Sequence, residues 1–252
     1  MFVIPGYDGA VTGGNVAVRV TGAGVVIVDD RLPPSSAQIM AQVRSVTSQP
    51  IRYVLSSHHH GDHTGGHTEF IEVAEIVAHE NNRGNMVRGN LAAPPRVVFT
   101  DRASVFLGEV EVQALYFGRG HTNGDAVTYF PDLKVVHTGD LVVWGKRTDG
   151  SQLTPFVDRR NGGSLNDWIG TIEKLLQLDF DTAIPGHGPV LTKNDVRVYY
   201  SHLVTLRQRL KELVASGGTR ADFESKLETD DLGWPFPRER LDELWDEFGA
   251  SR

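Results

Sequence analysis

The sequence predicts an α/β protein made of two mixed β-sheets with helices on their outer faces. Short apolar runs of strand length recur along most of the chain, and segments with helical periodicity follow each of two groups of them. No linker rich in Ser, Pro or Gly, no repeat and no low-complexity segment interrupts this pattern. We therefore expect a single domain over residues 1–252, with residues 218–252 as a helical C-terminal appendage of that domain.

The expected strands are short runs rich in Val, Ile, Leu and Phe, bounded by Gly, Asp or Pro. The first two are predicted to form a hairpin, because Thr21-Gly22-Ala23 joins them. The expected strands lie at residues 15–20, 24–28, 51–55, 75–78, 97–99, 105–107, 110–117, 126–130, 135–138 and 182–185.

The expected helices begin at capping signals. Pro33-Pro34-Ser35 opens a helix over residues 36–46, with Ser35 or Ser36 as its expected cap. Ser164 is expected to cap a second helix that runs to about residue 178. A long loop over residues 145–163 precedes it, and the longest helix is expected at residues 195–215. The apolar spacing in that longest helix favours packing on the core over packing on a second subunit.

Composition limits the classes of partner. The net charge of the 252-residue chain is −7, so we expect no nucleic-acid partner. The longest apolar runs are far too short to cross a bilayer, so we expect no membrane partner. The first residues lack a basic region followed by an apolar one, which predicts a cytoplasmic protein, or a periplasmic or secreted one if a signal peptide has been removed. The absence of cysteine excludes disulfides and thiolate metal ligands. The oligomeric state stays open.

The chemistry concentrates in the seven residues from Ser57 to His63, which hold four histidines and one aspartate directly after a predicted strand. In an extended segment, His58, His60 and Asp62 fall on one side, whereas His59 points the other way. Imidazole and carboxylate groups are good ligands for a borderline cation such as Zn²⁺. This segment therefore predicts a metal site.

Three more candidate ligands are expected in Gly-rich turns directly after predicted strands. Loops at strand ends allow a rigid sheet to present side chains to a common point. A single ion cannot use all the candidates, but two ions can share them and activate one bridging hydroxide. The three turns are Gly120-His121-Thr122, Thr138-Gly139-Asp140 and Pro185-Gly186-His187-Gly188.

This pattern resembles the metallo-β-lactamase superfamily, whose signature is H-x-H-x-D-H followed by a distant His, a distant Asp or Cys, and a last His. The resemblance extends from Asn15 to about Leu191 and implies an αββα sandwich. It also implies two metal sites with one bridging carboxylate. His58, His60 and His121 would hold the first metal, Asp62, His63 and His187 the second, and Asp140 would bridge them.

The bridging position distinguishes branches of the family. The best-known β-lactamases have Cys at the position of Asp140, or Ser with no bridge, whereas a bridging Asp is typical of glyoxalase II, lactonase and phosphodiesterase branches. Asp140 therefore weakens the expectation of a β-lactam substrate without removing it.

The resulting hypothesis is a hydrolase with two Zn²⁺ ions per chain, acting on a small-molecule β-lactam, lactone or thioester. A metal-bridging hydroxide would attack the amide, ester or thioester carbonyl, with Asp62 as the catalytic residue that holds this hydroxide. The alternative is a mononuclear iron dioxygenase of the same fold that acts on a persulfide. The di-iron branch resembles H-x-E-x-D, which His60 argues against. A metal-free binding protein is disfavoured because no candidate ligand is missing.

Other residues have both structural and functional interpretations. His59 is expected to pack or to support a metal ligand from behind, and His137 to pack in the core. The other histidines outside the motif are expected on the surface or on a helix face; these are His67, His79 and His202. Asn123 is expected to satisfy its own turn, while Asp125 could do the same or orient a histidine. One of Asp29 and Asp30 could support the metal site from behind. Trp144 and Phe156 are candidates for the substrate-pocket wall.

Overall fold

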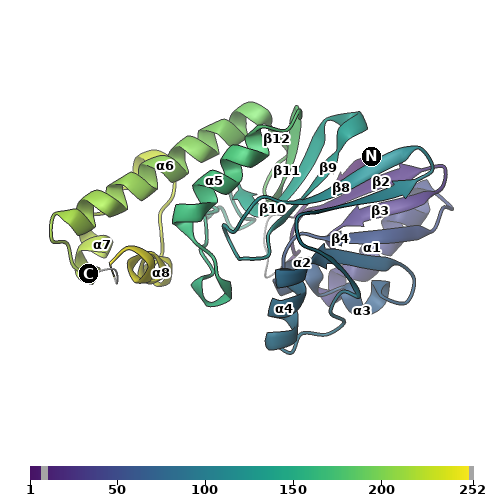
Figure 1. Ribbon diagram of the computed structural model, residues 1–252, viewed down its shortest axis with the longest axis horizontal. Helices are drawn as coiled ribbons and strands as arrows, with labels where there is room; N and C mark the ends of the chain where they lie inside the picture. The colour runs from purple at the N-terminus through teal and green to yellow at the C-terminus, as the bar shows by residue number, and fades with distance from the viewer. Residues whose placement is uncertain (7–10, 250–252) are drawn as a thin grey trace.

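Two six-stranded sheets form the centre of the computed structural model, which describes residues 1–6 and 11–249 (Figure 1). The first sheet has the order β1-β2-β3-β4-β5-β6, with parallel pairing from β3 to β6. Its strands are β1 (Phe2–Ile4), β2 (Val16–Thr21), β3 (Gly24–Val28), β4 (Ile51–Ser56), β5 (Glu75–His79) and β6 (Val97–Phe99). The predicted hairpin is confirmed, because β2 pairs antiparallel with β3.

The second sheet has the order β12-β11-β10-β9-β8-β7, and only β10 and β11 pair in parallel among these neighbours. Its strands are β7 (Arg102–Leu107), β8 (Val110–Tyr116), β9 (Ala126–Phe130), β10 (Val135–Val143), β11 (Thr182–His187) and β12 (Leu191–Thr192). Both sheets are therefore mixed, as the sequence predicts.

The helices cover the outer faces of the sheets (Figure 1). The α-helices are α1 (Pro33–Val46), α2 (Gly61–Thr64), α3 (His67–Phe70), α4 (Glu80–Arg88), α5 (Leu165–Leu176), α6 (Lys193–Ala215), α7 (Arg220–Lys226) and α8 (Arg238–Phe248). Short 3-10 turns lie at Pro131–Leu133, Arg159–Asn161 and Asp230–Leu232. None of the helices in the described part of the chain is long and apolar enough to span a membrane.

Three apolar clusters correspond to the layers. The middle cluster joins side chains of the two sheets, such as Val26 and Leu55 of the first and Val112 of the second. The outer cluster of the first sheet includes Ile39 of α1. The outer cluster of the second sheet is larger, because α5, α6, α7 and α8 all contribute to it, with Trp168 fully buried. Burial of apolar surface between the layers is the main force that holds the sandwich together.

The helix starts test the capping predictions. Ser164 caps α5, since its Oγ accepts a hydrogen bond from the amide of Asp167 at 3.2 Å. The prediction for α1 is wrong: Leu32 is the N-cap residue, and no side chain caps the helix. Proline at the first helical positions lacks an N–H that would need an acceptor. Ser36 instead donates from its Oγ to the carbonyl of Pro33 at 2.7 Å.

Two strands run further than expected, and this places two candidate ligands within a sheet. β10 continues through Asp140 to Val143, and β11 continues to His187, so neither candidate lies in a turn after its strand. The register between β10 and β11 shifts near Gly139, which has φ +52. A Cβ there would lie 2.6 Å from the side chain of Ser57. Glycine thus allows β10 to approach the histidine-rich segment closely.

The C-terminal helices are attached to the second sheet's outer cluster. Leu203, Leu206 and Leu210 of α6 are buried against the core, as expected. Leu244 of α8 belongs to the same cluster. Glu247 of α8 also accepts hydrogen bonds at the start of α5, at 2.7 Å from Ser164 Oγ, 2.9 Å from the amide of residue 165 and 3.0 Å from the amide of residue 166. These contacts hold α8 beside the loop over residues 145–163.

Candidate metal centre

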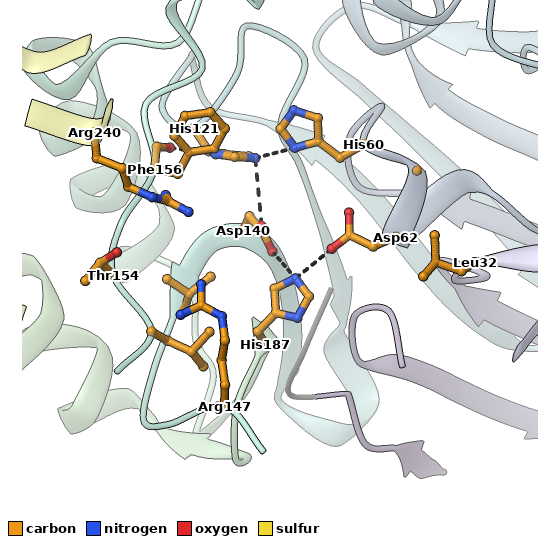
Figure 2. A pocket seen from close by; sticks show the side chains of 13 residues that line it. Leu32, His60, Asp62, His121, Asp140, Arg147, Thr154, Phe156, His187 and Arg240 are labelled. Atoms are coloured by element: carbon orange, nitrogen blue, oxygen red, sulfur yellow. Dashed lines mark hydrogen bonds and ion pairs between the residues drawn. The ribbon is translucent and has the colours of Figure 1, made fainter. Parts of the chain in front are cut away.

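All seven candidate ligands lie together beside one cavity of about 520 Å³. Figure 2 shows five of them turned into this cavity, and the dashed lines connect Asp140 and Asp62 to the surrounding histidines. A volume of this size is within the range of small-molecule sites. The residues shown are His60, Asp62, His121, Asp140 and His187.

The first group of candidates consists of His58, His60 and His121, whose ligand atoms lie within 4.8 Å of one another. His60 Nδ1 is 2.8 Å from His121 Nε2. His58 follows β4, His60 directly precedes α2, and His121 lies in the loop between β8 and β9. The fold therefore collects one site from two segments that are about sixty residues apart in the sequence.

The second group consists of Asp62, His63 and His187, again with ligand atoms within 4.8 Å of one another. His187 Nε2 lies 3.1 Å from Asp62 Oδ2 and 3.3 Å from His63 Nε2. The short helix α2 presents the first two side chains, and the end of β11 presents the third. This group is the counterpart of the first on the other side of Asp140.

Asp140 lies between the two groups and directs one carboxylate oxygen to each. Its Oδ2 is 4.0 Å from His58 Nε2 and 3.8 Å from His121 Nε2. Its Oδ1 is 3.3 Å from His63 Nε2 and 3.5 Å from His187 Nε2. This is the arrangement that a carboxylate shared between two cations requires.

The tautomers of the first group leave lone pairs turned inward. His60 Nε2 donates to Asp158 Oδ2 at 2.9 Å, and His121 Nδ1 donates to the carbonyl of Phe156 at 2.6 Å. A neutral imidazole has only one N–H, so the two nitrogens that face each other at 2.8 Å are both bare. Two lone pairs at this distance repel unless a cation or a proton lies between or beside them. The donors present therefore fit a metal ion.

His58 also has a ring nitrogen without a proton. Ser57 Oγ donates to Asp29 Oδ2 at 2.7 Å and accepts from His58 Nδ1 at 3.0 Å. His58 Nε2 is then bare, and it is buried without a hydrogen-bond partner among the described residues. Asp140 Oδ1 is likewise buried, and apart from its ion-pair contacts with His63 and His187 it has no hydrogen-bond partner there. Unpaired buried polar atoms are costly, and a cation would relieve both.

Protonation favours cation binding in the first group. Burial, and then repulsion from His63, holds the pKa of His58 well below its ordinary value. Burial, and then His60, lowers the pKa of His121 to about 3. Burial raises the pKa of Asp140, but His187 and His63 outweigh this effect and hold it well below the usual value. His58 and His121 are thus neutral and Asp140 is charged, which are the forms that bind metal.

The second group carries a strong negative field. Burial raises the pKa of Asp62, but His63 and then the hydrogen bond from His187 lower it to about 2. Burial lowers the pKa of His63, but the carboxylates of Asp62 and Asp140 raise it by more. This histidine therefore holds a proton in a position that a bound cation would take over.

Asp29 is the member of the acidic pair that supports the site from behind. Its Oδ2 accepts from His63 Nδ1 at 2.8 Å, and its Oδ1 accepts from the amide of Ser57 at 2.7 Å. Its φ of +62 is uncommon for a residue other than glycine, and aspartate tolerates it better than most. Asp30 instead accepts from His67 Nδ1 at 2.5 Å.

Asp158 is a residue of the site that no sequence pattern indicated, and it lies 98 residues after its partner His60. It is an isolated aspartate in the loop over residues 145–163, and no spacing marks it. The same loop supplies the carbonyl of Phe156, so it fixes the outer nitrogens of both His60 and His121. His59, His60 and Asp158 form a further group with ligand atoms within 4.8 Å. The hydrogen bond from His60 already occupies that carboxylate.

Several other expectations are corrected. His67 and His79 were expected on the surface or on a helix face, and both are buried: His67 begins helix α3 and His79 ends strand β5. His67 pairs with Asp30, and His79 stacks on Tyr116 with the ring centroids 3.8 Å apart. Trp144 does not line the metal cavity; its ring stacks on His202 at 6.1 Å. Phe156 does line the cavity, as expected.

The remaining polar candidates satisfy turns or the core. Asp125 accepts from the amide of Thr122 at 2.8 Å, and Asn123 Oδ1 accepts from Asn85 Nδ2 at 3.0 Å. Neither side chain lines the cavity. His137 is buried and donates from Nε2 to the carbonyl of Asn15 at 3.0 Å. His59 is also buried, and its Nδ1 lies 3.4 Å from an amide nitrogen of Asn85.

Comparison with known proteins agrees with this geometry. The family model described as "Metallo-beta-lactamase superfamily" matches residues 10–187. The chain belongs to the metallo-β-lactamase superfamily. Membership of this superfamily supports a metal-dependent hydrolase. The two sheets with flanking helices confirm the expected αββα sandwich.

Sequence relatives include two named enzymes. Over 171 residues the chain is 30% identical to the 2,4-dinitroanisole O-demethylase subunit alpha of Nocardioides sp. (strain JS1661), which covers 65% of this chain and 49% of that protein. The match therefore spans about half the length of this relative. Over 191 residues the chain is 25% identical to a metallo-beta-lactamase type 2 of Bacillus cereus, which covers 73% of this chain and 70% of that one.

The solved structures show the same fold. The metallo-beta-lactamase from Pontibacter korlensis aligns with a TM-score of 0.66 at 21% identity, over 75% of this chain and 86% of that chain. The family match ends at His187, so the C-terminal helices α6, α7 and α8 lie outside it.

Proposed function

We propose that this protein is a dinuclear zinc hydrolase that cleaves an ester, lactone, thioester or β-lactam carbonyl in a small molecule. The observation that carries the proposal is the position of Asp140, which directs one carboxylate oxygen to each of two histidine-containing groups. Two neighbouring cations sharing this carboxylate would satisfy both of its oxygens. Imidazole and carboxylate ligands without thiolate suit Zn²⁺.

When bound, two zinc ions would lower the pKa of water toward neutrality and polarise the substrate carbonyl. Asp62 faces the cavity as an ionised carboxylate with a side chain that is 21% exposed. It can therefore accept a hydrogen bond from the attacking water and orient it toward the substrate. We assign the catalytic role to this residue.

The other groups hold the site in shape. Asp29 and Asp158 fix the ring orientations of His63 and His60 through charged hydrogen bonds. The ring of Phe156 stacks on His60 at 6.1 Å and covers one wall of the cavity. This apolar wall limits the access of bulk water and strengthens the electrostatic interactions inside.

A bridging Asp favours an ester, lactone or thioester. The similarity to the Bacillus cereus enzyme supports a β-lactam as a further candidate. The similarity to the O-demethylase subunit supports a second function, the removal of a methyl group from an aryl methyl ether. The cavity suits any of these by volume, so the substrates must be compared directly.

The decisive experiment combines metal content with turnover. Zinc and iron are measured in the purified protein, which is then assayed with a chromogenic cephalosporin, an aryl lactone, a thioester and 2,4-dinitroanisole. We expect about two zinc ions per chain and a kcat/KM of about 10⁴ M⁻¹s⁻¹ or more for one carbonyl substrate. A single iron with persulfide oxidation, or turnover of the ether alone, would overturn the proposal.

Two variants and one matched control complete the test. Asp62→Asn and Asp140→Asn should each abolish turnover, and Asp140→Asn should also reduce the metal content. Asp149→Asn makes the same change at an exposed position on the loop after β10, so it should behave as the parent protein does. Full activity in either site variant contradicts the assignment.

A further inference from the structure

Two arginines line the metal cavity, and the proposed hydrolysis does not use them. Arg147 and Arg240 are the cationic side chains other than histidine among the cavity's described lining residues. Figure 2 shows both guanidinium groups turned into the cavity, on the side away from Asp62 and Leu32. They belong to separate elements, the loop over residues 145–163 and helix α8. Each element thus brings a positive charge to the same wall.

Arg240 is held rigidly in place. Its guanidinium carbon lies 4.4 Å from the ring centroid of Phe156, in a cation–π contact. Helix α8 is anchored by buried Leu244 and by the hydrogen bonds of Glu247 at the start of α5. Arg240 Nη1 is nevertheless buried without a hydrogen-bond partner among the described residues. A buried guanidinium N–H without an acceptor is costly, so a ligand that offers an acceptor at this wall would be favoured.

One nitrogen of the Arg147 guanidinium group is held by a hydrogen bond within its own loop. Its Nη1 donates to the carbonyl of Gln152 at 3.0 Å, across the turn where Lys146 and Gln152 form an isolated β-bridge. Burial, and then repulsion from Arg147, lowers the pKa of Arg240 to about 10. Arg240 therefore keeps its charge at neutral pH.

Among the described residues that line the cavity, no carboxylate forms a salt bridge with either arginine. The acidic side chains among the described lining residues are Asp62 and Asp140, and both face the histidines of the metal groups. Bound cations would make the cavity still more positive. A negatively charged ligand group would neutralise this wall and supply the acceptor that Arg240 lacks.

We propose that Arg240 and Arg147 form an anion subsite beside the metal centre, so that the substrate carries a carboxylate or phosphate group next to the bond that is cleaved. Guanidinium groups bind both anions through paired N–H donors. The role of this subsite in turnover rests on the proposed hydrolysis. Its binding of anions does not depend on that hydrolysis. Because Arg240 lies outside the family match, helix α8 gives this chain a substrate preference that the matched segment alone lacks.

The binding test uses three ligands that share a phenyl ring on the purified protein: benzoate, phenyl phosphate, and neutral benzamide, which has nearly the shape of benzoate. Calorimetry should show binding of at least one anion, and no binding of benzamide at the same concentration. Arg240→Gln should weaken the anion by about 10-fold or more, as expected for the loss of a charged hydrogen bond. Arg240→Lys keeps the charge and should recover part of the affinity. The tighter of the two anions identifies the carboxylate or the phosphate.

The matched control is Arg238→Gln, which removes the same charge from the same helix. Arg238 has a side chain that is 72% exposed and pairs with Glu224, away from the cavity. It should bind the anions as the parent protein does. Equal weakening in both variants would show a general effect of charge or of helix stability, and would overturn the subsite. Equal binding of benzamide and the anions by the parent protein would also overturn it.

The kinetic test compares two 4-nitrophenyl esters, the hemisuccinate with a free carboxylate and its methyl ester. The parent protein should prefer the acid by about 10-fold or more in kcat/KM, mainly through KM, and Arg240→Gln should bring the ratio close to one. An unchanged ratio in this variant refutes the subsite. If neither ester is cleaved, the proposed activity on such esters is wrong. The calorimetry still decides whether the anion subsite exists.

Discussion

Asp158 should control the affinity of the first metal group without touching a metal itself. Its Oδ2 accepts the Nε2–H of His60 at 2.9 Å, and its side chain is only 9% exposed. This contact keeps the proton on the outer nitrogen of His60 and leaves Nδ1 bare toward His121. Removing the carboxylate with Asp158→Ala would free the ring to rotate and to protonate Nδ1. We expect Asp158→Ala to lower zinc affinity of this group.

The expected loss is about 10-fold to 100-fold, equivalent to roughly 1.4 to 3 kcal/mol, as is typical for partners of metal-binding histidines. Asp158→Asn keeps an oxygen that can accept the same hydrogen bond, so its loss should be smaller. Competition with a chromophoric chelator measures the stepwise affinities, and the thermal midpoint of each variant shows whether the fold has changed.

A control separates this effect from damage to the loop. Asp158 Oδ2 also accepts from Asn161 Nδ2 at 2.8 Å, so Asn161→Ala disturbs the same turn but leaves the contact with His60. Asn161→Ala should bind zinc within about twofold of the parent, well below the loss expected for Asp158→Ala. If Asn161→Ala loses as much affinity as Asp158→Ala, or if Asp158→Ala loses none, the reasoning is refuted.

Three further predictions test other parts of the structure. His121→Ala should lose most of the first metal, measured by metal analysis after dialysis, while retention of two ions would contradict the assignment. Burial raises the pKa of Asp125 to about 7, so the folded state binds its proton more tightly than the unfolded state does. The contribution of Asp125 to the free energy of unfolding should therefore fall by up to about 1.4 kcal/mol per pH unit as the pH rises from 5 to 7. Asp125→Asn should remove this pH dependence, as measured by urea unfolding. The same pH dependence in the variant and the parent protein would contradict the prediction. Glu247→Ala would leave four hydrogen-bond donors at the start of α5 without their acceptor, so it should lower the free energy of unfolding in urea by roughly 2 kcal/mol. The exposed Glu239→Ala on the same helix should cost little, and similar losses in both variants would argue against the docking of α8.

The metal-binding candidates could be recognised in the sequence because their chemistry is local. His58, His60, Asp62 and His63 are close neighbours on one segment, and a short apolar run before them indicates the strand that carries them. The order of strand-length and helical segments likewise predicted two mixed sheets with helices on their outer faces. These features need no knowledge of which segments meet in space.

The partners of these residues depend on the tertiary structure. Asp158 meets His60 only because the loop over residues 145–163 folds back over the cavity, across 98 positions of sequence. His67 is buried because its Nδ1 finds Asp30, and without such a partner a polar ring would be expected at the surface.

The C-terminal helices show the same division between sequence and tertiary structure. Their apolar spacing predicted helices and a buried face, because that periodicity is a local property. The direction in which α8 lies on the molecule was set by contacts with α5, including those of Glu247. This docking brings Arg240 into a cavity whose other walls come from residues far earlier in the chain. Local patterns therefore determined which residues can bind a metal, and long-range packing decided which charges a substrate meets beside it.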